Sequence, residues 1–172
     1  MLVPGEAAHP VVTPDNRSVI FVSGRSGQQS LWTMPIEGGE PRQLVSRFAA
    51  APGVDFSPDG QSILFPSRDD ERKIAMVIIC DLADCRPREV LPGTVSTRFR
   101  WAPSGRAIAF IERDARTNIY TVPVAGGTPT QLTHFGDRLI ADFDWSPDGR
   151  QLVVVRTLET NDIVVLKGLR RE

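Results

Sequence analysis

Charged side chains that recur at matched positions are the residues of this chain best suited to chemistry. Asp55, Arg100 and Asp144 follow one another at intervals of 45 and 44 residues. Arg98 and Asp142 each stand two residues before a member of that series. Guanidinium groups and carboxylates either pair with one another or bind the charged groups of a ligand. The sequence leaves both alternatives open, ion pairs between repeats or a ligand site.

A second set of arginines stands in polar segments between apolar runs. A guanidinium group can hold a carboxylate through two parallel hydrogen bonds, so such arginines are candidates for binding an acidic partner. The alternative for each is an ordinary solvated loop position. The candidates are Arg25, Arg47, Arg68, Arg113, Arg116 and Arg138.

Catalytic motifs are missing from the sequence. The chain has two histidines, and its nearest approach to a nucleophile elbow, at 24–27, has the wrong spacing. The acidic run 69–71 is flanked by Arg68, Arg72 and Lys73, which favours a solvated loop over a cation site. No phosphate loop, His-Glu-x-x-His motif or calcium loop occurs. We therefore expect neither an enzyme nor a bound metal or cofactor.

The two cysteines bracket a predicted hairpin turn. Cys80 ends an apolar run, and Cys85 stands where two other repeats have the second glycine of a Gly-Gly turn. Antiparallel partners at such a turn bring their Cα atoms to about 5.5 Å, which suits a disulfide. The sequence does not decide between a disulfide bridge and two free thiols. A bridge would favour an oxidising compartment.

A repeated phrase, typified by Ser-Pro-Asp-Gly, defines the elements that must position these residues. It occurs at 13–16, 57–60, 102–105 and 146–149, and its prolines are 44, 45 and 44 residues apart. Proline fixes φ at the second position, aspartate bonds locally, and glycine accepts a positive φ, so each phrase predicts a tight turn between strands. The predicted turn residues are Pro14, Pro58, Asp59, Gly60, Pro103, Gly105, Pro147, Asp148 and Gly149.

Apolar runs around each turn predict four antiparallel strands per repeat of about 44 residues, the length of a propeller blade. We therefore expect an all-β fold, a β-propeller, with one partial domain over 1–172. The repeats span approximately 9–45, 53–91, 98–133 and 142–167. Leu2-Val3 reads as the end of a fourth strand, and the last repeat stops after its third strand, 163–166. This offset favours membership of a larger ring.

Such a blade has two kinds of edge. The turns between strands one and two, and three and four, lie on one face, here called the turn face. The loops between strands two and three, and the connections between blades, lie on the opposite loop face. The longer loops are on the loop face, so we expect binding there, and we expect the short turns of the turn face to shape no site.

Composition limits the classes of partner that this chain is expected to bind. Twenty basic and 21 acidic residues leave a net charge of −1, which disfavours nucleic acid. No stretch of the sequence approaches 18 apolar residues, so we expect no membrane insertion by this segment. The first residues lack a basic and then apolar leader pattern, which predicts a cytoplasmic location if this chain is the complete product.

The repeat resembles the WD-like repeat of TolB-type β-propellers over residues 9–167. Ser-Pro-Asp-Gly, a following Ile/Leu-x-Phe, and a later Gly-Gly and Gln-Leu-Thr carry the likeness. The segments 118–120, 131–135, 140–145 and 160–164 resemble the closing blades of bacterial propellers attached to a serine/threonine kinase or a winged-helix domain. Neither effector domain is in this chain.

The resemblance implies a non-catalytic module, outside the cytoplasm in a longer protein, that binds protein or peptide or senses a ligand. Further blades or a second copy would close its ring. The alternative is a propeller that gates substrate for a prolyl-oligopeptidase-like hydrolase whose catalytic domain is absent here.

Two packing expectations follow from the register. Trp101 and Trp145, one residue before their turns, should lie between adjacent sheets. An unfinished ring should also expose apolar side chains on its two outer faces and promote association of the chain. We expect these side chains at Val19, Phe21 and Leu31 of the first repeat, and at Leu152, Val154 and Val164 of the last.

Overall fold

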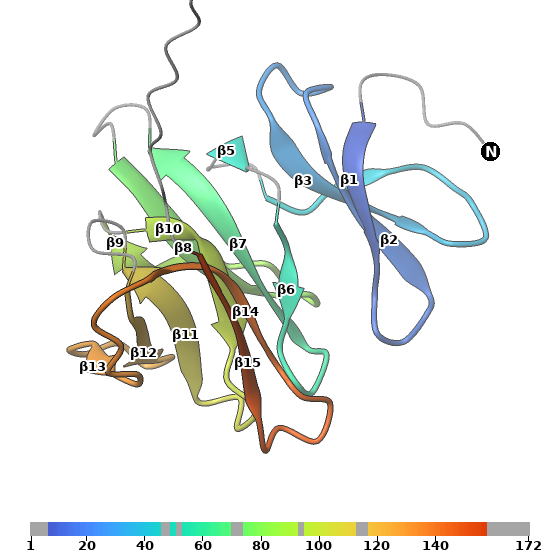
Figure 1. Ribbon diagram of the computed structural model, residues 1–172. Coiled ribbons are helices and arrows are strands. Elements are labelled where there is room, and N and C mark those ends of the chain that lie inside the picture. The colour runs from blue at the N-terminus through green and yellow to red at the C-terminus, as the bar shows by residue number, and fades with distance from the viewer. Residues whose placement is uncertain are drawn as a thin grey trace, which may run out of the picture.

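The computed structural model describes residues 7–45, 49–50, 53–69, 74–92, 95–112 and 117–157. Within these ranges the chain forms strands and turns, arranged as successive antiparallel sheets (Figure 1). The first sheet, blade 1, has the order β1-β2-β3-β4. Its strands are β1 (Ala7–Val12), β2 (Ser18–Ser23), β3 (Ser30–Pro35) and β4 (Arg42–Gln43).

Blade 2 has an interrupted first strand. Two short segments, β5 (Ala49–Ala50) and β6 (Asp55–Phe56), both pair with β7 (Ser62–Asp69). The sheet continues through β8 (Ile74–Asp81) to β9 (Arg88–Pro92).

Blades 3 and 4 follow the same plan. Blade 3 comprises β10 (Val95–Trp101), β11 (Ala107–Glu112), β12 (Ile119–Pro123) and β13 (Thr130–Gln131). Blade 4 is described through β14 (Leu139–Trp145) and β15 (Leu152–Thr157). The predicted strand 163–166 and the segment Leu2-Val3 lie outside the described residues. Figure 1 shows β6, β10 and β14, each the inner strand of its blade, beside one another.

Apolar side chains from neighbouring blades interlock because alternate residues of a strand point to opposite faces. Leu64 and Ile79 of blade 2 share a core with Phe99 and Trp101 of blade 3, and Trp101 is 6% exposed. Trp145 packs, partly buried, against the core between blades 3 and 4. Both tryptophans therefore lie between sheets, as expected.

The outer face of blade 1 differs from our expectation. Phe21 is only 4% exposed, and the Arg25 guanidinium lies 5.6 Å from its ring centroid. Leu31 belongs to the core between blades 1 and 2. The expected exposure of Phe21 and Leu31 is therefore wrong, because an arginine of the same blade covers one and blade 2 covers the other.

The outer face of blade 4 is shifted by one residue from our expectation. Leu152 and Val154 pack toward blade 3, whereas Val153 and Val155 are 59% and 51% exposed. Alternation along β15 explains the shift, since Ile63 and Ile108, the equivalents of Leu152 in blades 2 and 3, lie in the cores shared with the preceding blade. Val164 lies outside the described residues.

Three of the four turns have a common side-chain hydrogen-bond pattern that explains their sequence. In blade 2, Ser57 Oγ donates to Asp59 Oδ1 at 2.6 Å, and Gln61 N donates to the same oxygen at 3.0 Å. Blades 1 and 4 repeat the pattern with Asp15 and Asp148. These bonds, of which the serine or threonine hydroxyl bond is the strongest, lower the pKa of the three carboxyls. The turn of blade 3, with Ala102 and Ser104, lacks the carboxylate but keeps the main-chain bond from Gly105 N to the Ala102 carbonyl, at 2.9 Å.

Candidate functional site

Irregularities in the inner strands set the position of the charged side chains. The pairing of β10 with β11 shifts register between Val95 and Phe99, and that of β14 with β15 shifts between Ile140 and Asp142. A bulge of this kind bends a strand and redirects the side chains that follow it. Arg98 and Asp142 lie at these irregularities, so the local backbone places them beside the axis of the blades.

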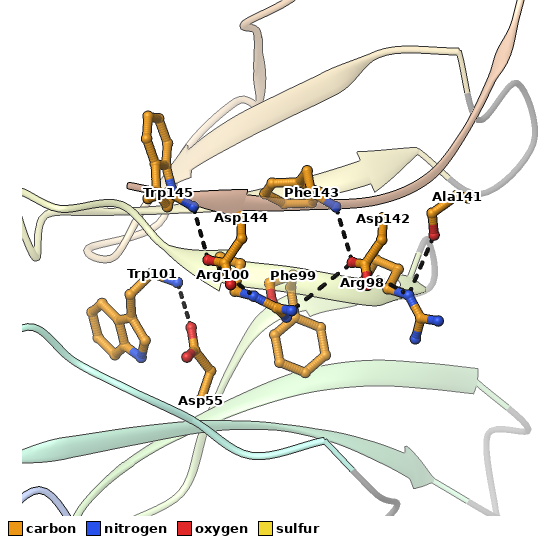
Figure 2. A network of polar contacts seen from close by, with 10 residues as sticks. All are labelled: Asp55, Arg98, Phe99, Arg100, Trp101, Ala141, Asp142, Phe143, Asp144 and Trp145. Atoms are coloured by element: carbon orange, nitrogen blue, oxygen red, sulfur yellow. Dashed lines mark hydrogen bonds and ion pairs between the residues drawn. The ribbon is translucent and has the colours of Figure 1, made fainter. Parts of the chain in front are cut away.

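Ion pairs connect blade 3 to blade 4 along the inner strands (Figure 2). Arg98 Nε lies 3.5 Å from Asp142 Oδ1, and Arg100 Nη2 lies 3.9 Å from the same oxygen. Arg100 Nε lies 3.5 Å from Asp144 Oδ1. The ion pairs expected between repeats are thus present, and we call Arg98, Arg100, Asp142 and Asp144 the axial cluster.

Main-chain groups orient the members of the axial cluster. Arg100 Nη1 donates to the Phe99 carbonyl at 2.9 Å, and Arg98 Nε donates to the Ala141 carbonyl at 3.4 Å. Asp142 Oδ1 accepts from Phe143 N, and Asp144 Oδ1 accepts from Trp145 N, at 2.9 and 2.8 Å (Figure 2). The guanidinium and carboxylate groups are therefore held in place before any ligand arrives.

Asp55 extends the polar contacts from blade 2. Its Oδ2 accepts a hydrogen bond of 2.7 Å from the main-chain N of Trp101, so it joins the inner strands of blades 2 and 3 (Figure 2). Burial raises the pKa of the Asp55 carboxyl, and the bond from Trp101 N and the charge of Arg100 oppose that rise. Asp55 is therefore an inter-blade connector within the fold.

Exposure decides what the axial cluster can do. The side chains of Arg98 and Asp142 are 48% and 45% exposed, and that of Asp144 is 68% exposed. Partly exposed ion pairs contribute little to stability and exchange partners at low cost. A ligand that offers a carboxylate and an ammonium or guanidinium group can therefore replace the internal partners.

The three described loop arginines, Arg25, Arg68 and Arg138, belong to different blades. Arg25 lies over Phe21 and over the ring of Trp32, with its Cζ 4.9 Å from the Trp32 centroid. Arg138 Nε lies 3.7 Å from Asp137 Oδ2, and Arg68 is exposed at the end of β7. Arg25 thus packs on aromatic rings of its own blade. Arg47, Arg113 and Arg116 lie outside the described residues.

Arg156 is a site residue that sequence reasoning missed. Its guanidinium lies 4.1 Å from the ring centroid of Phe135 and pairs with Asp137. It stands within β15, where an alternating strand pattern gives no reason to expect a contact with the preceding loop. It fixes the loop that leads into β14, and therefore the approach to Asp142.

The cysteines form a disulfide in the structure, with a Cα–Cα separation of 4.9 Å. Cys80 is 1% exposed at the end of β8, and Cys85 packs partly buried against the core of blades 1 and 2. The bridge replaces the Gly-Gly turn that blades 1 and 3 use at this position. Within the described ranges, no group of three or more His, Cys, Asp or Glu residues is arranged to hold a metal ion.

Comparison with known proteins identifies the architecture. The chain is 30% identical over 153 residues to the TolB homolog of Chlorobium luteolum, covering 88% of this chain and 34% of that protein. It superimposes on TolB from Acinetobacter baumannii with a TM-score of 0.73 at 22% identity, covering 94% of this chain and 40% of that one. The fold is that of a TolB-like β-propeller.

The chain is also similar to a protein of a different kind. The chain is 31% identical over 163 residues to the uncharacterized peptidase YuxL of Bacillus subtilis, covering 89% of this chain and 22% of that protein. It thus spans between 22% and 34% of the length of these two relatives. No family model matches it. The described part of the chain has no helix of the length and apolarity needed to cross a membrane.

Proposed function

We propose that this chain is a non-catalytic module of a larger bacterial protein, and that it binds a peptide or protein segment at the axial cluster. The observation that supports the proposal most is the pairing of Arg98 with Asp142 across two blades, with both side chains about half exposed. Fixed guanidinium and carboxylate groups of this kind suit the alternating charges of a peptide better than a neutral small molecule.

A selection experiment tests this function. The immobilised chain is exposed to a display library of random peptides, and enriched sequences are synthesised and measured by calorimetry. We expect the enriched peptides to carry charged residues and to lose about tenfold or more in affinity for the variant Arg98→Gln/Asp142→Asn. The charge-exchanged variant Arg98→Asp/Asp142→Arg keeps the pair and the net charge, so it serves as the matched control for folding. Peptides that bind both variants as tightly as the parent would contradict the proposal.

A second candidate function is gating for a hydrolase domain elsewhere in the protein. The likeness to a peptidase supports it, since this chain spans only 22% of that relative. The two functions differ in what the flanking coding sequence holds. A kinase or winged-helix domain there supports sensing, whereas an α/β-hydrolase region that reacts with a fluorophosphonate probe supports gating.

We also propose a location outside the cytoplasm. The disulfide between Cys80 and Cys85 supports it, because such bridges persist in oxidising compartments. Alkylation of thiols in intact cells tests it: both cysteines should resist the reagent until the protein is reduced, and two reactive thiols would oppose this location.

A further inference from the structure

A groove on the turn face lies between blades 1 and 2. Its volume is about 780 Å³, within the range of about 300–1,000 Å³ typical of ligand sites. Pro14, Met34, Leu44 and Leu82 supply apolar walls. We expected the short turns of this face to shape no site, but two neighbouring turns together form a groove.

The equivalent groove between blades 2 and 3 is smaller, about 260 Å³, because side chains of the protein itself occupy it. Trp101 lines it, and Arg88 Nη1 crosses it to donate to the main-chain carbonyl of Val124 at 2.5 Å. This contact shows how a guanidinium at that position binds a peptide carbonyl.

Arg42 occupies the position of Arg88 in the first groove. Each follows a third-to-fourth strand turn, and each stands opposite an equivalent residue, Thr33 for Arg42 and Ile79 for Arg88. Arg42 lines the groove, and its guanidinium makes no hydrogen bond or ion pair with the described residues. The counterpart of Trp101 in blade 2 is the smaller Phe56, which does not line the groove. The groove is open because it has neither a guanidinium bonded across it nor a tryptophan in its lining.

The walls of the open groove are fixed in advance. Pro14 packs against Gly60, where an added Cβ would lie 3.3 Å from the proline Cβ. The disulfide of Cys80 and Cys85 closes the loop that carries Leu82 and Ala83. A preformed site loses less entropy on binding than one that must be ordered.

Charge indicates what the groove accepts. Three carboxylates line it, those of Asp15, Glu40 and Asp59, against the single guanidinium of Arg42. Hydrogen bonds from Thr13 and Ser57 lower the pKa of Asp15 and Asp59, so both are ionised at neutral pH. The excess of negative charge favours a cationic partner.

We propose that this groove binds an extended peptide segment in which a basic side chain stands among apolar ones. The basic group of the peptide pairs with the carboxylates, and its apolar side chains pack against Met34 and Leu82. A main-chain carbonyl of the peptide accepts a hydrogen bond from Arg42, as the Val124 carbonyl does from Arg88. The site is separate from the axial cluster and independent of the function proposed for it.

Fluorescence anisotropy with two labelled peptides, Ala-Leu-Lys-Leu-Ala and Ala-Leu-Glu-Leu-Ala, tests the proposal. We expect the lysine peptide to bind at least about tenfold more tightly than the glutamate peptide. Glu40→Lys should weaken the lysine peptide about five- to tenfold, and Ala83→Trp, which fills the groove, should abolish binding. Glu37→Lys makes the same charge change on the same turn outside the groove lining and should alter affinity less than about twofold.

The outcomes separate this site from the other proposal. Arg98→Gln/Asp142→Asn should leave binding of the lysine peptide unchanged. Equal affinity for the two peptides, or indifference to both Glu40→Lys and Ala83→Trp, would overturn the proposal. Sedimentation that reveals a dimer abolished by Ala83→Trp would also overturn it, because the occupant would then be a second copy of this chain.

Discussion

Pro103 in the turn of blade 3 packs directly against Gly149 in the turn of blade 4. A Cβ added at residue 149 would lie 2.6 Å from the Cβ of Pro103. The same proline-to-glycine contact joins Pro14 to Gly60 and, more loosely, Pro58 to Gly105. The glycine of the repeated phrase therefore serves two purposes, a positive φ and close contact with the preceding blade.

Substitution of Gly149 by Ala separates these two purposes. Residues 149 and 105 have almost the same φ, 68° and 67°, so either alanine incurs the left-handed penalty of about 1–2 kcal/mol. Gly149→Ala should lose a further 1–3 kcal/mol, roughly, from overpacking against Pro103. A Cβ added at residue 105 would lie 3.8 Å from the nearest atom of Pro58, an ordinary contact distance. Gly105→Ala is therefore the matched control. Urea unfolding that gives equal losses for the two variants would disprove the close contact.

Asp55 should make stability depend on pH in a direction unusual for a carboxylate. Its pKa is raised by burial, so the folded state favours the protonated form. The stability that this carboxyl contributes is present at pH below 3.8, its ordinary pKa, and is lost as the pH rises through the raised pKa of the folded state. The free energy of unfolding of the parent, relative to Asp55→Asn, should therefore fall over that interval.

The control for Asp55 concerns its hydrogen bond. Asparagine retains an oxygen that can accept from Trp101 N, whereas Asp55→Ala leaves that donor unpaired at a cost of about 1–3 kcal/mol. The loss in Asp55→Ala should persist at every pH. A parent that gains stability relative to Asp55→Asn on passing to neutral pH would contradict the assigned direction.

The disulfide should contribute modestly to stability. A loop with a sequence separation of 5 restricts little of the unfolded chain, so the Cys80→Ala/Cys85→Ala variant should be less stable by about 2 kcal/mol. Thiol titration of denatured, unreduced protein should detect no free thiol. Detection of two thiols per chain would show that the bridge does not form in solution.

Val153 and Val155 should drive association of the chain through the outer face of blade 4. Their counterparts Ala109 and Ile111 in blade 3 are 0% and 1% exposed because blade 4 covers them. Analytical ultracentrifugation should detect self-association that Val153→Lys/Val155→Glu abolishes. Leu152 and Val154 face blade 3, so Leu152→Lys should instead lower stability. A parent chain that remains monomeric at high concentration would refute this prediction.

The repeated turn made the fold predictable because its chemistry is local. Asp59 bonds to groups within two residues of itself, so the phrase carries its own structure wherever it occurs. Its period then places the strands and the charged positions of the axial cluster. The pairing of Arg98 with Asp142 followed from that register.

Contacts of long side chains were harder to anticipate. Arg25 lies over Phe21 because of the path of a loop, and the turn-face groove depends on Arg42 having no partner where Arg88 has one. The first depends on the orientation of a long side chain within one blade, and the second on its orientation between two blades. A periodic pattern specifies which face a residue occupies, but it does not specify which neighbour a flexible guanidinium reaches.

The most direct test of the binding role is a nuclear magnetic resonance titration of the isotopically labelled chain with a selected peptide. We expect the largest amide shifts at Arg98, Arg100, Asp142 and Asp144, and we expect Arg98→Gln/Asp142→Asn to remove them. A peptide that binds with no shift at these four residues would contradict the assignment of the axial cluster as the binding site.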